Sequence, residues 1–187
     1  MLTVLSLWLP ILVSAALIFV ASALIHMFLG YHAGDLAPVS NEDATMAALR
    51  PIPPGDYIMP HARGMEAMKS PEFVEKRTRG PVVLMTVMPP GPATMGKELT
   101  LWFVYCIVVS VFAAYLTSRA VMPGSEFWEV FRFAGTSAFL GYALAHWQES
   151  IWFKRKWSTT LKNTLDGLVY ALITGAVFGW LWPGVAA

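Results

Sequence analysis

Two histidines and a carboxylate lie close together in the stretch HMFLGYHAGD, residues 26–35, where a long apolar segment ends. No Asp, Glu, Lys or Arg precedes Asp35. Imidazole and carboxylate groups in one place suit Zn, Fe or Mn. A continuous helix would turn His26 and His32 about 240° apart, whereas a break at Gly30 lets the two rings converge. His61 then lies within reach along the loop that follows. The candidate metal ligands are therefore His26, His32, Asp35 and His61.

A structural interpretation of the same residues stays open. Their spacing matches no compact ligand motif such as His-Glu-x-x-His. In this interpretation, His26 and His32 lie at the membrane–water interface and form hydrogen bonds with lipid headgroups or loop carbonyls. The sequence requires no cofactor, although a metal ion is compatible with it.

Methionines offer a second metal hypothesis. The pairs Met65-x-x-Met68 and Met85-x-x-Met88 resemble Cu(I) sites, since thioether sulfur is a soft ligand. Met59-x-His61 offers a further sulfur and an imidazole. The alternative is that these methionines are adaptable apolar filler.

Composition indicates the surroundings in which these residues lie. The chain has 187 residues, of which 56% are hydrophobic and 13% are charged. Soluble domains have about a quarter of their residues charged, so this composition predicts an integral membrane protein. Eight tryptophans agree with a membrane–water interface. A net charge of +1 gives no reason to expect a nucleic-acid partner.

Four apolar segments are long enough to be predicted as membrane helices. They cover about residues 3–29, 99–117, 127–147 and 167–182. The first has no basic residue before its apolar run and is too long for a signal peptide, so we expect it to be retained. The predicted fold is an all-α, four-helix transmembrane bundle with a structured loop cap. Its parts are residues 1–29 (first helix), 30–96 (cap) and 97–187 (three further helices).

The cap has its own local signals. Ser40 to Asp43 reads as a capping box that opens a short helix ending near Arg50. Ser70 and Pro71 open a second one, ending near Arg79. Residues 82–88 read as a strand that residues 57–59 could pair with. We expect this cap to lie on one end of the bundle.

Small residues recur at a spacing of four in the last two predicted helices. Such rows let helix backbones approach closely in lipid. They fit packing inside one bundle, and the alternative is a homo-oligomer interface. The residues concerned are Ser137, Gly141, Ala145, Ala171, Gly175 and Gly179.

Charge outside the spans predicts the orientation. Lys154, Arg155, Lys156 and Lys162 lie in the loop between the third and fourth spans. The positive-inside rule puts this loop and the cap in the cytoplasm, with both termini outside. The expected location is the inner membrane of a bacterium.

The layout resembles a bacterial group of four-span membrane proteins of unknown function. The likeness is carried by residues 135–141 through 152–153 and by residues 166–170 through 179–180. It implies an isolated first helix, a loop and three closely spaced helices, and it implies no catalytic residues.

The predicted activity follows from what the spans contain. No predicted span has an acid or base near its middle, and no nucleotide loop or nucleophile elbow occurs. We therefore expect a non-enzymatic accessory or scaffold subunit, or a small homo-oligomer. A metal-binding protein or enzyme with its site in the cap is the alternative, and a small transporter is the third.

Overall fold

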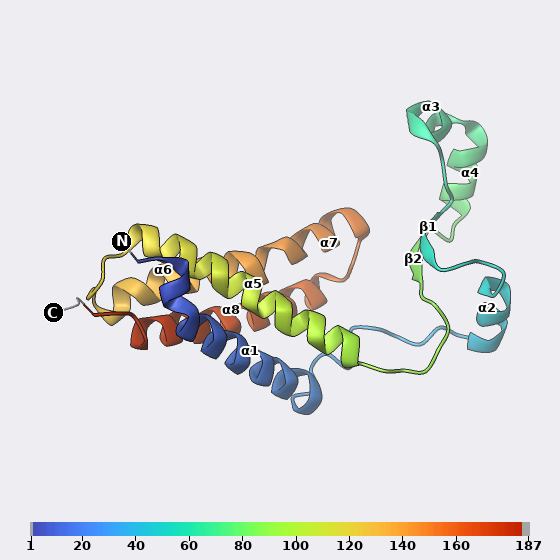
Figure 1. The fold of residues 1–187 in the computed structure, drawn as a ribbon. Coiled ribbons are helices and arrows are strands. Elements are labelled where there is room, and N and C mark those ends of the chain that lie inside the picture. Colours follow the sequence, from blue (N-terminus) through green and yellow to red (C-terminus); the bar gives the residue numbers. More distant parts are fainter. Residues whose placement is uncertain (1, 185–187) are drawn as a thin grey trace. The chain divides into compact units, whose positions relative to one another are not determined.

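The computed structural model describes residues 2–184 and divides the chain into two compact units (Figure 1). The first, which we term the helical unit, comprises Met1–Leu36 and Thr94–Ala187. The second, the insert unit, comprises Ala37–Ala93. The protein is mostly helical, with one small two-stranded sheet.

Four long helices make up most of the helical unit. Its elements are η1 (Val4–Leu7), α1 (Trp8–Phe28), α5 (Gly96–Ala120), α6 (Phe127–Tyr142), η2 (Leu144–His146), α7 (Trp147–Phe153) and α8 (Trp157–Trp180). Helix α1 contacts α5 and α8, and α6 contacts the same two helices. Each long helix therefore packs against two of the others, side by side along the unit (Figure 1).

Many buried side chains of the helical unit are small or polar, whereas many side chains on its outer faces are large and apolar. Ser14, Ser110 and Thr117 are fully buried, along with several alanines. Large apolar side chains point outward instead, among them Trp8 (59% exposed) and Phe112 (63% exposed). A few large side chains, such as Phe178 and Ile18, are also fully buried, but the number of large apolar residues on the outer faces exceeds what a soluble bundle usually shows.

Two helices are long and apolar enough to cross a membrane, Val4–Phe28 and Gly96–Ala120. The other two depart from the predicted bounds. Helix α6 ends at Tyr142, not at 147, so it has only 16 residues. Helix α8 begins at Trp157, not near 167, so it runs through a polar stretch that hydropathy alone excludes from a span.

Small residues permit close packing between these helices. A Cβ built on Gly175 would lie 2.9 Å from the backbone oxygen of Phe131, and one on Gly179 would lie 2.5 Å from the ring of Phe127. Across the α5–α6 contact, a Cβ on Gly141 would lie 3.0 Å from Val109.

The other members of the predicted rows behave differently from one another. Ala171 is buried, with its carbonyl 3.3 Å from where a Cβ of Gly135 would stand. Ser137 donates its hydroxyl to the carbonyl of Phe133 within α6. Including Ala145 was wrong, because α6 has ended before it and the residue is exposed in the η2 turn.

The insert unit is built from short elements. These are α2 (Glu42–Leu49), β1 (Gly55–Met59), α3 (Gly64–Lys69), α4 (Pro71–Arg79) and β2 (Val83–Val87). The predicted strand pair is correct: β1 and β2 are antiparallel, with Tyr57 opposite Met85. The unit contains no buried side chain.

One of the two predicted helix caps in this unit is correct. Ser70 caps α4 by accepting a hydrogen bond from the amide of Phe73 at 3.3 Å. The predicted capping box at Ser40 is wrong, because Asn41 occupies the N-cap position of α2. Asn41 has φ 57°, a left-handed conformation that asparagine tolerates better than most residues, and no side chain caps this helix.

Candidate metal centre

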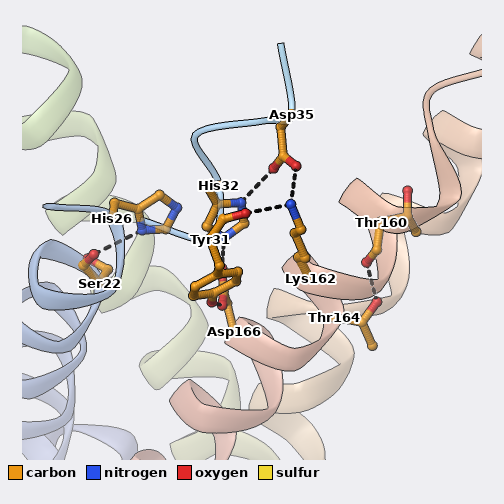
Figure 2. A network of polar contacts seen from close by, with 9 residues as sticks. All are labelled: Ser22, His26, Tyr31, His32, Asp35, Thr160, Lys162, Thr164 and Asp166. Atoms are coloured by element: carbon orange, nitrogen blue, oxygen red, sulfur yellow. Dashed lines mark hydrogen bonds and ion pairs between the residues drawn. The ribbon is translucent and has the colours of Figure 1, made fainter. Parts of the chain in front are cut away.

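The turn that follows α1 gathers the histidine-rich stretch. Helix α1 ends at Phe28, and Gly30 adopts φ +63°, a conformation that favours glycine. Hydrogen bonds from Ala33 N to the Gly30 carbonyl and from Asp35 N to the His32 carbonyl, both 3.0 Å, then close a tight turn. The turn directs its side chains toward α8 (Figure 2).

The two histidine rings are stacked as a result. The centroids of His26 and His32 lie 4.7 Å apart, with 4° between the ring planes. The Nδ1 of His26 lies 2.9 Å from the Ser22 carbonyl, which can only accept, so this nitrogen carries the proton. Among residues 2–184, no hydrogen bond to the Nε2 atom of His26 is found.

His32 lies between two carboxylates. Its Nδ1 is 2.6 Å from Oδ2 of Asp35, and its Nε2 is 2.9 Å from Oδ2 of Asp166. Asp166 comes from α8, is only 4% exposed, and also accepts the hydroxyl of Tyr31. Hydrogen bonds to charged groups therefore join α8 to the turn after α1, more than 130 residues away in sequence. Such bonds are worth about 1.5–3 kcal/mol each.

Lys162 completes the arrangement one helical turn before Asp166. Its Nζ lies 2.6 Å from Oδ1 of Asp35 and 2.5 Å from the carbonyl of Tyr31 (Figure 2). The ammonium of Lys162, with His32 as the second partner, holds the pKa of Asp35 down at about 2, so this carboxylate is ionised at neutral pH. We term these residues the polar cluster: His26, Tyr31, His32, Asp35, Lys162 and Asp166.

Three members of the polar cluster could hold one metal ion. His26, His32 and Asp166 each offer a ligand atom within 4.8 Å of the others. Metal-binding histidines usually donate their second ring nitrogen to a carbonyl or carboxylate, which fixes the ring. Both rings have such a partner at Nδ1: the Ser22 carbonyl for His26 and Asp35 for His32.

The candidate ligand atoms are consequently the two Nε2 atoms and Oδ2 of Asp166, whose other oxygen accepts from Tyr31. A bound ion would replace the hydrogen bond that now joins Nε2 of His32 to Oδ2 of Asp166. Three protein ligands leave a fourth position for water or a substrate, as in catalytic zinc sites. Because the rings are nearly parallel, an ion in the plane of both requires one of them to rotate about its Cβ–Cγ bond.

A cavity of about 510 Å³ adjoins the polar cluster. Its walls come from the last turns of α1, the first turns of α5, the end of α6 and the middle of α8. Most of the lining is apolar or aromatic, and His26 and Asp166 form part of it. An ion held by these two residues would thus stand at the edge of the cavity.

The structure brings together three of the four predicted ligands. His26, His32 and Asp35 lie in the polar cluster, where Asp35 supports His32 from the side away from Asp166. His61 belongs to the insert unit. Whether any of them binds a metal stays a prediction.

Sequence reasoning missed Asp166, Lys162 and Tyr31 as members of the site. A signal was present, because residues 162 and 166 are four apart and so share one face of a helix. It was overlooked since the helix was expected to begin only after both residues.

Comparison with protein-family models, with curated proteins and with solved structures finds no match for this chain.

Proposed function

We propose that this protein is an integral membrane protein that binds one transition-metal ion between His26, His32 and Asp166. The observation that carries the proposal is the set of supporting hydrogen bonds. Every candidate ligand has its other polar atom fixed by a partner, namely the Ser22 carbonyl, Asp35 or Tyr31. A purely structural ion pair does not require a second histidine stacked on the first.

The membrane part of the proposal has α1, α5, α6 and α8 all spanning the bilayer of a bacterial inner membrane. Support for α6 and α8 comes from their outer faces. Phe133 and Leu140 on α6, and Leu165 and Leu172 on α8, are all more than 40% exposed. Exposed apolar surface on four adjacent helices suits contact with lipid.

The chemistry of the ligands restricts the identity of the metal. Two imidazoles and one carboxylate suit Zn²⁺, Fe²⁺ or Mn²⁺ better than Cu⁺, which prefers sulfur. The open coordination position beside a cavity gives a bound metal the opportunity to act as a Lewis acid toward a ligand there.

Elemental analysis of protein purified without a histidine tag tests this proposal. We expect about one Zn, Fe or Mn per chain, and loss of most of it in His32→Ala and in Asp166→Asn. His146→Ala is the matched control, since His146 lines the cavity but is not in the metal group. It should keep the metal.

Two outcomes would sink the proposal. One is metal-free protein that remains metal-free after dialysis against Zn²⁺, Fe²⁺ and Mn²⁺ in turn. The other is metal that survives both cluster substitutions in protein with wild-type thermal unfolding. Loss of the metal in His61→Ala would instead support the ligand set predicted from sequence, which includes the insert unit.

A second candidate function, an accessory subunit or a small homo-oligomer, is favoured by the insert unit. Its side chains are all at least partly exposed, and Met46, Met65, Leu84 and Met88 are more than half exposed. Apolar surface of this kind suits a partner. Native mass spectrometry from mild detergent should then detect an oligomer or a bound protein, and a monomer alone would count against this function.

A further inference from the structure

The aromatic residues around the cavity differ in one respect, which is how their hydrogen-bond donors are used. Trp102 donates its Nε1 to the hydroxyl of Ser22 at 2.8 Å, and Tyr105 donates its hydroxyl to the Gly141 carbonyl at 2.6 Å. Tyr142 donates to the carbonyl of Cys106 at 3.4 Å. The hydroxyl of Tyr170 is also buried, yet it has no hydrogen-bond partner among the described residues.

An unused buried donor is costly. Leaving a buried hydroxyl without a partner costs about 1–3 kcal/mol, so such groups call for a physical explanation. Tyr170 is 4% exposed and lines the cavity one helical turn after Asp166. A hydrogen-bond acceptor on a ligand in the cavity would satisfy this hydroxyl when the Tyr170 side chain turns it toward the cavity.

The charge of the walls restricts the headgroup of such a ligand. Asp166 lines the cavity, and none of the described lining residues is Lys or Arg. The ammonium of Lys162 is already bound to Asp35 and to the carbonyl of Tyr31. In the metal-free protein, a phosphate or carboxylate headgroup would therefore meet the Asp166 carboxylate without a Lys or Arg to pair with, whereas an uncharged headgroup meets no such penalty.

The shape and polarity of the walls restrict the ligand further. Trp102, Tyr142 and Tyr170 contact one another with ring centroids 5.5–6.2 Å apart and ring planes inclined by 58–76°, so the cavity is lined by both faces and edges of aromatic rings. A ring-shaped headgroup can contact such a lining in offset-stacked or edge-to-face geometry. A volume near 510 Å³ is within the usual range for small-molecule sites.

We propose that the cavity binds an uncharged, ring-headed amphiphile of the membrane quinone type, with a ring carbonyl accepting the hydroxyl of Tyr170. The apolar tail would lie along the aliphatic and aromatic lining toward lipid. The inference does not depend on the metal, because the residues that carry it are the aromatic lining and the unpartnered hydroxyl.

Binding of a decyl-substituted benzoquinone to the purified full-length protein in nonionic detergent tests this. Quenching of tryptophan fluorescence would be measured with and without a chelator, so that the metal proposal can fail separately. We expect saturable binding of one quinone per chain. Tyr170→Phe, which removes only the hydroxyl, should weaken it roughly fivefold, whereas Tyr57→Phe in the insert unit should not.

A second pair of variants tests the place of binding without touching a hydrogen bond. Ala23 lines the cavity and Ala16, two turns earlier on α1, is exposed. Ala23→Phe fills the cavity and should abolish saturable binding, while Ala16→Phe should leave the affinity unchanged. The proposal is overturned if the quinone does not saturate, if Ala23→Phe binds normally, or if dodecanoate binds as tightly as the quinone.

Discussion

Gly175→Leu is the substitution that most directly tests how closely α6 and α8 pack. A Cβ at this position would already lie 2.9 Å from the backbone oxygen of Phe131, and the rest of the leucine side chain needs more room. Because a backbone atom cannot swing aside, the helices must separate. Overpacking of this kind costs about 1–3 kcal/mol, and we expect the upper end.

Gly96→Leu is the matched control. Gly96 is the first residue of α5, and nothing lies within 4 Å of its built Cβ. Leucine is the better helix former at both positions, by up to about 0.8 kcal/mol in a helix interior, so the difference between the variants is mainly the steric cost. For a chain of this length a difference of about 3 kcal/mol corresponds to roughly 6–12 °C in Tm.

The assay is thermal unfolding in nonionic detergent, followed by tryptophan fluorescence. Gly175→Leu should unfold at the lower temperature by that margin, while Gly96→Leu should match or slightly exceed the wild type. Equal Tm values for the two variants would refute the reasoning, because they would mean that Gly175 on α8 faces lipid and does not pack against Phe131 of α6.

Lys162→Met should lower Tm, because two partly buried acceptors lose their donor, and the loss should be about 1.5–3 kcal/mol; an unchanged Tm would mean that these two hydrogen bonds contribute no stability. Ser70→Ala should speed amide hydrogen exchange in α4 through the loss of about 1 kcal/mol of capping, whereas Ser40→Ala, at a position without a cap, should not. A reporter fused after Ala187 should be found outside the cell and one inserted after Met95 in the cytoplasm, and the reverse pattern would overturn the proposed orientation.

The sequence by itself determined the local features. Apolar runs of sufficient length identified α1 and α5 as candidate spans, because hydropathy along one helix needs no partner. The cap at Ser70 was equally local, since it joins Ser70 to the amide of Phe73. Strands β1 and β2 pair residues farther apart in the chain, but the alternation of β2 is visible within its own few residues. The break near Gly30 could be anticipated because glycine is the residue that adopts positive φ at no steric cost.

Tertiary structure alone decided which residues meet. Asp166 and Lys162 are more than 125 residues from Asp35 and His32, so no spacing rule joins them, and the helix that carries them is polar over its first half. Hydropathy reads such a stretch as a loop, whereas burial beside the turn after α1 makes it a helix with paired charges. The unpartnered hydroxyl of Tyr170 was equally invisible to the sequence, because a missing hydrogen bond is a property of three-dimensional packing and not of residue type.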